Sequence, residues 1–436
     1  MIVIIGGGIS GLTLGYYLQK QKIPYILVEQ SQKIGGNIQT LCLQGRTLEL
    51  GPNTVLAKPH VWELIQELNL TEQIIYPDKK ARKRFILKKN GYAALPSNPV
   101  SLLLNSFFSL STKIQILKDL SKKPNPNPPK KETVHDFFVR HFGIEVAEQV
   151  VNPFVAGIYA GDSQKLITEY AFPTLIEAEK HTGSIIKGFI KYQKMYRSKG
   201  SISFRNGMHT LVQTIYQAQK SSVYLNTFIE KIEFGDLKHT LILSNKNTVS
   251  AKRIVFTAPA YSVAKYVESL SADFAQKLAC IPYAPVCVVH SVYRKDKVKH
   301  KLDGFGALHP SMYNTFILGT IFSSTIFPNT CHSDEVLLTS FIGQKFLSYS
   351  QNEIQDKVHQ ELANYLNITE APIFTHLHVW EKAIPQYEAN YADILPFVHQ
   401  WESKGIYFSG NWLNGISVEK CIEVNKHLAQ KLATLD

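Results

Sequence analysis

Cysteines are few in this chain and are not arranged in pairs. Five occur among 436 residues, and no two of them form a CxxC motif. The fifteen histidines include no HExxH or other closely spaced ligand pattern. We therefore expect no disulfide framework and no metal site, but reduced thiols of the kind found in cytosolic proteins.

Long apolar runs are also missing. A membrane-spanning helix needs roughly 18–20 consecutive apolar residues, and no run approaches that length, so any membrane contact is expected to be peripheral. The opening residues MIVIIGGG already have the pattern of a strand and a glycine turn, which predicts that no targeting peptide stands there. A length of 436 residues predicts two or three domains, and a hydrophobic fraction of 44% excludes wholesale disorder.

Acidic residues are scarce relative to basic ones. Asp and Glu total 35 against 47 Lys and Arg, which gives a net charge of +12. This excess favours nucleic acid, phospholipid headgroups or acidic small molecules as partners, although solubility alone also explains it. The most basic stretch is KKARKRFILKKNG at 79–91. No nucleic-acid recognition motif accompanies it, so we predict no nucleic-acid partner.

The amino-terminal residues carry a dinucleotide-binding pattern. The apolar strand IVII runs directly into Gly6-x-Gly8-x-x-Gly11, and a helical segment follows. A second apolar strand then ends at Glu29, eighteen residues after Gly11. In such units the glycines allow a tight turn, approach of a pyrophosphate and close helix packing, and the acid accepts hydrogen bonds from a ribose. Because strand, glycines, helix, strand and acid stand in the right order, we predict a dinucleotide site.

No second glycine motif is present, and this bears on which dinucleotide binds. The nearest imitation, GFGALH at Gly304, lacks the third glycine. A single site indicates that the bound dinucleotide is itself the redox centre, which favours FAD with an acceptor other than a nicotinamide. Gly35 and Gly36, and then Gly51 and Pro52, allow close approach of the backbone to the rest of a long cofactor, although ordinary turns explain them as well.

The segment LPSNPVSLLLNSFFSLSTKIQILKDLSKK, starting at Leu95, is apolar but interrupted by polar residues. We consider two interpretations equally: an interfacial helix lying on a membrane, or a core-facing helix pair. After the connector KKPNPNPPKK, Thr133 is predicted to cap a helix, with Asp136 in the capping-box position. The apolar residues that would form one face of the first segment are Leu102, Leu103, Phe107, Phe108, Leu110 and Ile114.

Two later stretches are candidates for ligand contacts. Ala156, Gly157 and Ala160 stand beside aromatic residues, where small side chains allow either a flat ligand or tight helix packing. Near the carboxyl end, a strand leads to Gly410 and Gly415 and then to a helix. Its free N–H groups and positive dipole end would stabilise the negative charge of a reduced flavin. The segments DGFGALHP, FILGTIFSS and VLLTSFIG are predicted to be successive strands of a second sheet.

Taken together, the motifs resemble those of the oxygen-dependent protoporphyrinogen oxidases, a family within the flavin amine oxidase superfamily. The matching stretches follow the family order from the first strand to the last helix. The FVAGIYAGD and ETVHDFF stretches are the more specific ones, since the first and last motifs are shared across the superfamily. They are GGGISGL, VEQSQKIGG, ELGPN, RFILKKNGYAALP, ETVHDFFVRHFG, FVAGIYAGDSQKL, SFRNGMHTL, GFGALHP and GNWLNGISVEKCIE.

The resemblance implies an α/β fold in three parts. These are a Rossmann-type FAD-binding domain made of discontinuous segments (1–80, 196–260 and 385–436), an α+β substrate domain with a mixed sheet (81–91 and 261–384), and a helical membrane-binding insertion (92–195). It shifts the interpretation of the apolar segment towards the membrane. It also implies a cytoplasm of bacterial type, with the protein peripheral on the cytoplasmic face of the inner membrane.

The activity implied is the oxidation of protoporphyrinogen IX to protoporphyrin IX in haem biosynthesis. It proceeds in three two-electron steps, with hydride transfer from a bridging carbon to N5 of non-covalent FAD and with oxygen reduced to hydrogen peroxide. No residue matches an obligatory acid–base catalyst. A homodimer, a quinone in place of oxygen and direct transfer of product to a ferrochelatase all stay open.

Site residues are carried over by motif. Arg84 matches an arginine that pairs with a substrate propionate, since its planar fork suits a carboxylate. The neighbouring Lys79, Lys80, Arg82 and Lys83 are then expected to be solvated or near the entrance. The other substrate contacts implied are Gly157, Phe305, Leu308, Ile321 and Phe341. The FAD contacts implied are Gly6, Gly7, Gly8, Ile9, Ser10, Gly11, Glu29, Gly35, Gly36, Asn37, Gly51, Pro52, Asn53, Thr54, Ile229, Gly410, Asn411, Gly415, Ile416, Ser417 and Val418. Asn37 stands where some relatives have a large aromatic residue, which leaves the packing there open.

Three alternatives remain. Coproporphyrinogen III, which has four propionates, is kept as a substrate by the basic run around Arg84. A flavin amine oxidase or carotenoid desaturase is suggested by Trp412, but no matching aromatic partner is evident. A non-catalytic FAD protein would keep the cofactor motifs without needing the substrate residues. Cys421 lies in the last helix, where we expect a structural thiol and not a covalent flavin link.

Overall fold

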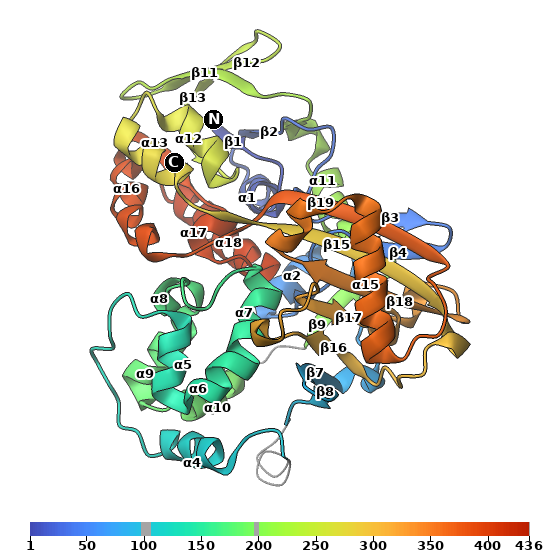
Figure 1. Cartoon of the computed structure of the whole chain (residues 1–436). Coiled ribbons are helices and arrows are strands. Elements are labelled where there is room, and N and C mark those ends of the chain that lie inside the picture. The colour runs from blue at the N-terminus through green and yellow to red at the C-terminus, as the bar shows by residue number, and fades with distance from the viewer. Residues whose placement is uncertain (97–105, 196–199, 436) are drawn as a thin grey trace.

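The computed structural model describes residues 1–96, 106–195 and 200–435 and contains two sheets and a group of helices (Figure 1). A parallel sheet and a mixed sheet lie side by side, and the helices of 110–195 are grouped next to both (Figure 1). The predicted α/β class, with a parallel and a mixed sheet, is confirmed.

The parallel sheet contains the first and nearly the last segments of the chain. Every pairing within it is parallel. Its strands are short apolar runs because both faces are covered, as is usual for parallel sheets. In spatial order they are β10 (Val223–Tyr224), β2 (Tyr25–Val28), β1 (Ile2–Ile5), β14 (Arg253–Phe256) and β20 (Ile406–Phe408).

Alternate residues of β1 enter two different cores. Ile2 and Ile4 pack into the core formed with a layer of helices, whereas Val3 and Ile5 pack into a core shared with a small antiparallel sheet. The helical layer consists of α1 (Ile9–Lys20), α2 (Pro59–Glu67), α11 (His209–Gln217) and α18 (Val418–Ala433). The opposite layer consists of β11 (Ile229–Glu233), β12 (His239–Leu243), β13 (Thr248–Ala251), α12 (Ala260–Val267), α13 (Ala272–Ala279) and α16 (Leu395–Gln400).

The mixed sheet contains the three strands that the sequence predicts to be successive. They are adjacent, and only the β7–β16 pair is parallel. One face packs against the long helix α15 (Gln351–Leu366), through Ile354, Val358, Leu362 and Leu366. In spatial order the strands are β19 (Phe374–Pro385), β15 (Tyr283–Arg294), β18 (Glu335–Ile342), β17 (Gly319–Ile321), β16 (Gly304–Leu308), β7 (Lys83–Lys88) and β8 (Gly91–Ala94).

A buried ion pair attaches a hairpin of the first part to the mixed sheet. Arg46 donates from Nε and Nη2 to both carboxylate oxygens of Glu335, and its guanidinium lies over the ring of Phe374. Short strands and helices complete the junction between the two sheets. They are β3 (Thr40–Leu43), β4 (Arg46–Glu49), β5 (Val55–Leu56), β6 (Ile74–Ile75), β9 (Ser201–Phe204), α14 (Ser323–Ile326) and α17 (Asn411–Asn414).

The helices of 110–195 form a group whose buried side chains, such as Phe137 and Val155, belong to the same core as Val3 and Ile5 of β1. The predicted cap is confirmed, since the Thr133 hydroxyl accepts a hydrogen bond from Asp136 N at the start of α5. Within the described residues, no helix is long and apolar enough to cross a membrane. The helices are α4 (Leu110–Asp119), α5 (Val134–Phe142), α6 (Ile144–Val146), α7 (Asn152–Tyr159), α8 (Thr168–Ala171), α9 (Pro173–Thr182) and α10 (Ile185–Met195).

The prediction of a single apolar helix face in the segment that starts at Leu95 is wrong in part. Phe107 and Phe108 precede α4 and are buried in the core, whereas Leu110 and Ile114 of α4 are exposed. The reason is that Ser109 caps the helix, so the two phenylalanines lie outside its periodicity. Leu102 and Leu103 fall outside the described residues.

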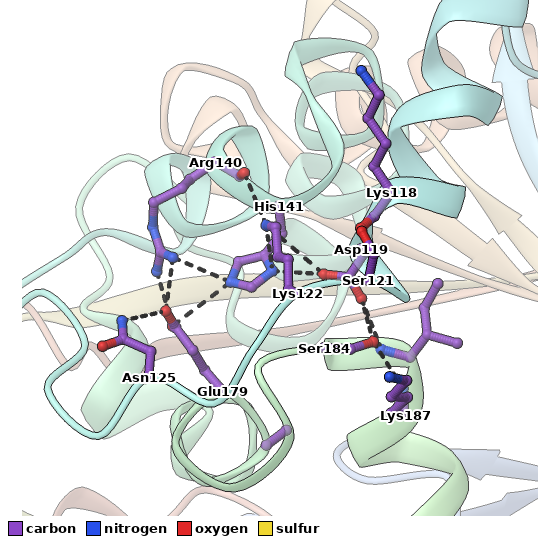
Figure 2. A network of polar contacts seen from close by, with 12 residues as sticks. Lys118, Asp119, Ser121, Lys122, Asn125, Arg140, His141, Glu179, Ser184 and Lys187 are labelled. Atoms are coloured by element: carbon purple, nitrogen blue, oxygen red, sulfur yellow. Dashed lines mark hydrogen bonds and ion pairs between the residues drawn. The ribbon is translucent and has the colours of Figure 1, made fainter.

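A buried network of charges holds the helices of this unit together (Figure 2). Asp119, fully buried at the end of α4, accepts hydrogen bonds from His141 Nδ1 (2.8 Å), Ser184 Oγ (2.7 Å) and Ile186 N (3.2 Å). Glu179 of α9 accepts two from Arg140 of α5 (2.8 and 2.9 Å). Burial alone would raise the pKa of Asp119, but these hydrogen bonds and the adjacent His141 lower it overall.

We predict that Asp119→Ala destabilises this unit by roughly 3 kcal/mol, because it removes the carboxylate that pairs with the buried His141 and that accepts from Ser184 Oγ and Ile186 N at the start of α10. Since the folded-state pKa of Asp119 is lowered, its contribution is complete above about pH 4 and fades as the pH falls through the folded value. Urea unfolding, with hydrogen exchange in α4 and α10, measures the effect. The control is Asp136→Asn, since Asp136 is exposed and bonded to His135. Equal losses in the two variants would contradict the prediction.

Candidate active site

The turn between β1 and α1 has the geometry that the glycine pattern predicts. Gly6 has a φ of +120°, and a Cβ there would lie 2.8 Å from Ala258 N. A Cβ on Gly11 would lie 2.0 Å from Gly6 O, so only glycine lets α1 pack this close to the strand. At Gly8, by contrast, a Cβ would meet no atom within 4 Å. The backbone at Gly8 therefore faces open space in which a phosphate fits.

Glu29 lies against this turn, one residue beyond β2. Its Oε2 accepts a hydrogen bond from Gly7 N (2.6 Å) and its Oε1 accepts one from Ser31 N (2.8 Å). Glu29 O also accepts from Thr227 N (3.0 Å), which leads the chain into β11 and the buried Ile229. The carboxylate thus stands at the carboxyl end of the parallel sheet, where a ribose hydroxyl would reach it.

A second glycine segment runs beside the first. Gly35 N donates to Gly7 O (2.8 Å), and Gly36 has a φ of +57°. A Cβ on Gly51 would lie 1.9 Å from Asn37 O, so the start of the segment with Pro52, Asn53 and Thr54 packs against the double glycine. Asn37 itself reaches the mixed sheet, since its Nδ2 donates to Ala383 O (3.2 Å).

The carboxyl-terminal segment returns to the same edge of the parallel sheet. It passes from β20 through Gly410, with a φ of +134°, and α17, which starts at Asn411, to Gly415, with a φ of +104°. After Ile416, Ser417 caps the 16-residue helix α18 by accepting from Lys420 N (3.1 Å), and Val418 begins the helix. The positive end of α18 therefore lies at the sheet edge that also holds the turn of α1.

Two tyrosines that sequence analysis did not single out hold this segment in place. Gly415 N donates to Tyr387 Oη (2.9 Å), and Tyr387 Oη in turn donates to Asn411 O. Tyr391 Oη donates to Leu413 O (2.8 Å). In the sequence the two tyrosines are four residues apart and precede the last strand. This spacing does not indicate which atoms they bind.

Trp412 does not face an open site. Its side chain is fully buried, and its Nε1 donates to Ala258 O (3.1 Å). It therefore packs inside the core and gives no support to an aromatic cage for an amine. Cys421 is likewise buried, and burial raises the pKa of its thiol to about 11.

These three segments fit an extended dinucleotide. The open backbone at Gly8 suits a pyrophosphate, the Glu29 carboxylate suits a ribose, and the positive end of α18 suits negative charge at the far end of a flavin. Gly36 lies beside this turn, since a Cβ there would be 3.5 Å from Gly8 Cα, so the two glycine segments approach closely.

The predicted substrate residues of the mixed sheet lie on one face. Across β16, β17 and β18, Leu308 pairs with Gly319 and Gly319 with Phe341, while Ile321 pairs with Gly306. Paired residues of neighbouring strands share a face. This is the face opposite α15, and Leu308, Ile321 and Phe341 on it are only partly buried. Phe305 lies at a register shift in β16 and packs against the same buried cluster as Ile321. Partly exposed apolar side chains alternating with glycine form a flat surface that suits a ring.

Arg84 and Gly157 lie at this face. The Arg84 guanidinium carbon is 4.2 Å from the centre of the Phe305 ring, and Nη1 donates to Ala81 O (3.0 Å). Arg84 forms no ion pair with a carboxylate of the described residues. Gly157 of α7 stands over Leu308, since a Cβ there would lie 2.7 Å from Leu308 Cδ2. The structure thus brings the helical unit, Arg84 and the apolar face together.

The neighbours of Arg84 are exposed, as predicted: Lys79, Lys80, Arg82 and Lys83. Lys83 pairs with Asp303. Arg84 is exposed as well, but desolvation of its guanidinium beside the Phe305 ring lowers its pKa from the usual value, and the group stays charged.

Trp380 links the dinucleotide cradle to the apolar face of the mixed sheet, and the sequence analysis did not single it out. It lies on β19, paired with Val286 and on the same face as Phe341, and its Nε1 donates to Leu50 O (2.6 Å). Nothing in its local sequence indicates this contact, which joins residues 330 positions apart. Trp380 therefore stands between the second glycine segment and the apolar face.

Comparisons with known proteins agree with this geometry. Residues 9–432 match the family described as flavin containing amine oxidoreductase. The chain is 30% identical to protoporphyrinogen oxidase 2, chloroplastic/mitochondrial, of Arabidopsis thaliana, covering 97% of this chain and 91% of that one. It is 25% identical to coproporphyrinogen III oxidase of Bacillus subtilis (strain 168), covering 98% and 96%.

A similar fold occurs in a crystal structure from Exiguobacterium sp. 255-15, described as a candidate protoporphyrinogen oxidase. The TM-score is 0.83 at 20% identity, covering 100% of this chain and 99% of that one. The chain belongs to the flavin containing amine oxidoreductase family, and within it resembles protoporphyrinogen oxidases.

Proposed function

We propose that this protein is an FAD-dependent oxidase that converts protoporphyrinogen IX to protoporphyrin IX in haem biosynthesis, with oxygen as acceptor and hydrogen peroxide as product. The observation that carries the proposal is the placement of Arg84 over Phe305 at the rim of a flat apolar face, next to a dinucleotide cradle. A porphyrinogen has the matching parts: apolar rings and carboxylates. The names of the relatives support this substrate class.

FAD, when bound, supplies the acceptor for hydride from carbon. The chain's own residues then bind and orient the substrate. Leu308, Ile321 and Phe341 present apolar surface to the rings, and Arg84 offers a two-pronged donor to a propionate. Gly157 lets the helical unit close over Leu308 without a side chain in between. Exclusion of water by these contacts protects the reacting carbon. The individual roles of the site residues stay predictions. The division into domains also stays a prediction: an FAD-binding domain of 1–80, 196–260 and 385–436, a substrate domain of 81–91 and 261–384, and a helical insertion of 92–195.

Coproporphyrinogen III is the second candidate substrate. The exposed cations Lys79, Lys80 and Arg82 next to Arg84 provide charge for further carboxylates. The Bacillus subtilis relative is named for this substrate.

We further propose peripheral membrane contact, on the cytoplasmic face of a bacterial-type inner membrane. Leu110, Ile114 and Leu117 of α4 are exposed by 74%, 47% and 48%, and their spacing puts them on one side of the helix. Exposed Phe189 and Ile190 of α10 lie between exposed lysines at 187 and 191. Apolar side chains flanked by cations suit the interface of an anionic bilayer. Such a surface also suits a second copy of the chain or a ferrochelatase that receives the product.

The proposed activity predicts anaerobic bleaching of the FAD-loaded protein by protoporphyrinogen IX, followed by porphyrin fluorescence when air is admitted. Coproporphyrinogen III is mixed in a parallel experiment. Bleaching by the first alone supports the proposal, and bleaching by the second alone moves the assignment to the other substrate. Bleaching by neither contradicts both and favours an amine, a carotenoid or a non-catalytic role.

Arg84→Ala is predicted to raise the KM for the porphyrinogen about 10- to 100-fold, since a hydrogen bond to a charged group contributes about 1.5–3 kcal/mol. FAD affinity should not change. Arg84→Lys is expected to recover part of the loss, because a lysine keeps the charge but not the fork. Arg82→Ala is the matched control and should mainly alter the dependence of association on salt. An unchanged KM in Arg84→Ala would remove this residue from the site.

Replacing Leu110, Ile114 and Leu117 together with serine is predicted to weaken binding to phosphatidylglycerol vesicles by at least about tenfold, because each inserted side chain contributes about 1.5–3 kcal/mol. Vesicle co-sedimentation measures the change. Leu237→Ser provides the control, since Leu237 is 87% exposed in the loop between β11 and β12. Equal binding by the triple variant and the wild type would exclude α4 as the contact.

A further inference from the structure

Glu49, the last residue of β4, holds a carboxyl group inside the junction between the two sheets. Its Oε1 accepts a hydrogen bond from Met208 N (2.7 Å), and its Oε2 accepts one from Thr40 Oγ1 (2.8 Å). Glu49 stands two residues before Gly51, at the start of the segment predicted to contact the flavin. Both hydrogen-bond partners of the Glu49 carboxyl group are neutral. The group can therefore gain or lose a proton without breaking an ion pair.

A small cavity connects this carboxyl group to both halves of the site. It is lined by Glu49, by Asn53 and Thr54 of the predicted flavin segment, and by Ile321 of the predicted substrate face. The space open to a water-sized molecule is about 20 Å³, enough for one water. Ser323 and Thr339, whose hydroxyls are hydrogen-bonded to each other (2.7 Å), also line it, so polar residues surround a water there.

The cavity leads towards solvent. Ile75, Arg205, Phe327 and Asn329 line the cavity and also line a wider, more open pocket next to it, with Tyr76 at its side. Arg205 and Tyr76 are exposed. The route from Glu49 therefore ends at the surface near Arg205. It enters the junction from its own side, since none of its lining residues belongs to the helical unit that carries Gly157.

Within the part of the chain that the structure describes, the Glu49 carboxylate forms no ion pair. Burial raises its pKa to about 7, although the hydrogen bonds from Met208 N and Thr40 lower it. The titratable groups nearby are Arg205, on the same cavity, His209, whose N donates to Thr40 Oγ1 (3.0 Å), and His290, whose Nε2 donates to Glu49 O (3.1 Å). Burial lowers the pKa of His290 to about 3, so it is neutral.

We propose that Glu49 is a proton-exchanging residue for the bound flavin, taking up a proton when the flavin is reduced and releasing it on reoxidation, through the cavity that ends near Arg205. The inference rests on the proposed function. Each two-electron step transfers a hydride from carbon to the flavin and frees a proton from a pyrrole nitrogen. Oxygen then takes up the hydride equivalent and one proton to give hydrogen peroxide. An O–H bond thus forms on the Glu49 carboxylate in the first half and breaks in the second.

Electrostatics gives the direction of this coupling. Reduction adds negative charge to the flavin, which disfavours a second negative charge nearby. Protonation of Glu49 therefore becomes easier after reduction. In the pH range just above 7 the carboxylate is ionised beside oxidised flavin and protonated beside reduced flavin, so one additional proton accompanies the two electrons.

A purely structural role makes a different prediction. Glu49 also accepts from the backbone at the start of α11, as a helix cap would. Glu49→Gln keeps that contact, because its amide oxygen accepts from Met208 N, while the Thr40 hydroxyl can accept from its amide nitrogen. The variant should fold and bind FAD normally, yet it cannot exchange a proton.

The test is a spectroelectrochemical titration of the FAD-loaded protein from pH 6 to 9. For the wild type we expect a bend in the plot of midpoint potential against pH, near or above pH 7, which Glu49→Gln removes. Infrared difference spectra of reduced minus oxidised protein should show a protonated carboxyl band that the variant lacks. An identical bend and identical band in the two proteins would overturn the proposal, as would a wild type with neither.

Glu361→Gln is the matched control. Glu361 of α15 is another glutamate whose pKa is raised by burial, and its carboxylate accepts hydrogen bonds from Phe316 N and Ile317 N. It lies on the face of the mixed sheet away from the cavity, so its replacement should leave both the bend and the band unchanged. Because the titration uses no porphyrinogen, its result is independent of whether protoporphyrinogen IX bleaches the flavin.

Discussion

The two sheets are held in a fixed relative position by side chains that donate hydrogen bonds to backbone oxygens across their junction. Trp380 and His290 of the mixed sheet donate to Leu50 O and Glu49 O, and Asn37 donates in the opposite direction to Ala383 O. A hydrogen bond to a backbone oxygen needs no particular side chain on the accepting residue. The junction can therefore form beside a segment that is rich in glycine. These contacts set the distance between the dinucleotide cradle and the apolar face of the mixed sheet. The relative position of a bound cofactor and a bound substrate therefore depends on them.

The buried pair of Arg46 and Glu335 adds orientation to this junction. A two-pronged hydrogen bond between planar groups tolerates little rotation, and the desolvated pair contributes geometry more than net stability. Asp119 and His141 have a comparable role in the helical unit, where they tie α4 to α5 and α10. Both networks use buried charges at places where helices and hairpins meet at angles that apolar packing alone would leave variable.

Local chemistry made much of the fold predictable from the sequence. The turn of Gly6, Gly8 and Gly11 follows from sterics that operate within a dozen residues, and the Thr133 cap likewise depends on its own next turn. Contacts between residues of different segments left no such trace: Trp380 with Leu50, 330 positions apart, and Tyr387 with Gly415, 28 positions apart. Phe107 and Phe108 were misassigned because a cap at Ser109 interrupts a periodicity that the apolar pattern alone suggests is continuous. The two halves of the site could therefore be listed from motifs, whereas the way they meet required the structure.

The order of strands in the parallel sheet has a consequence for biosynthesis. β1 pairs with β2 immediately, but its other neighbour, β14, lies about 250 residues later, and β20 and α18 come from the last tenth of the chain. Contacts of such long sequence separation form slowly and expose apolar surface until they do. The ribosome releases α1 early, yet α1 packs chiefly against α18. The cofactor cradle is thus assembled only after synthesis is nearly complete, and newly made chains must stay unaggregated until their final helix arrives.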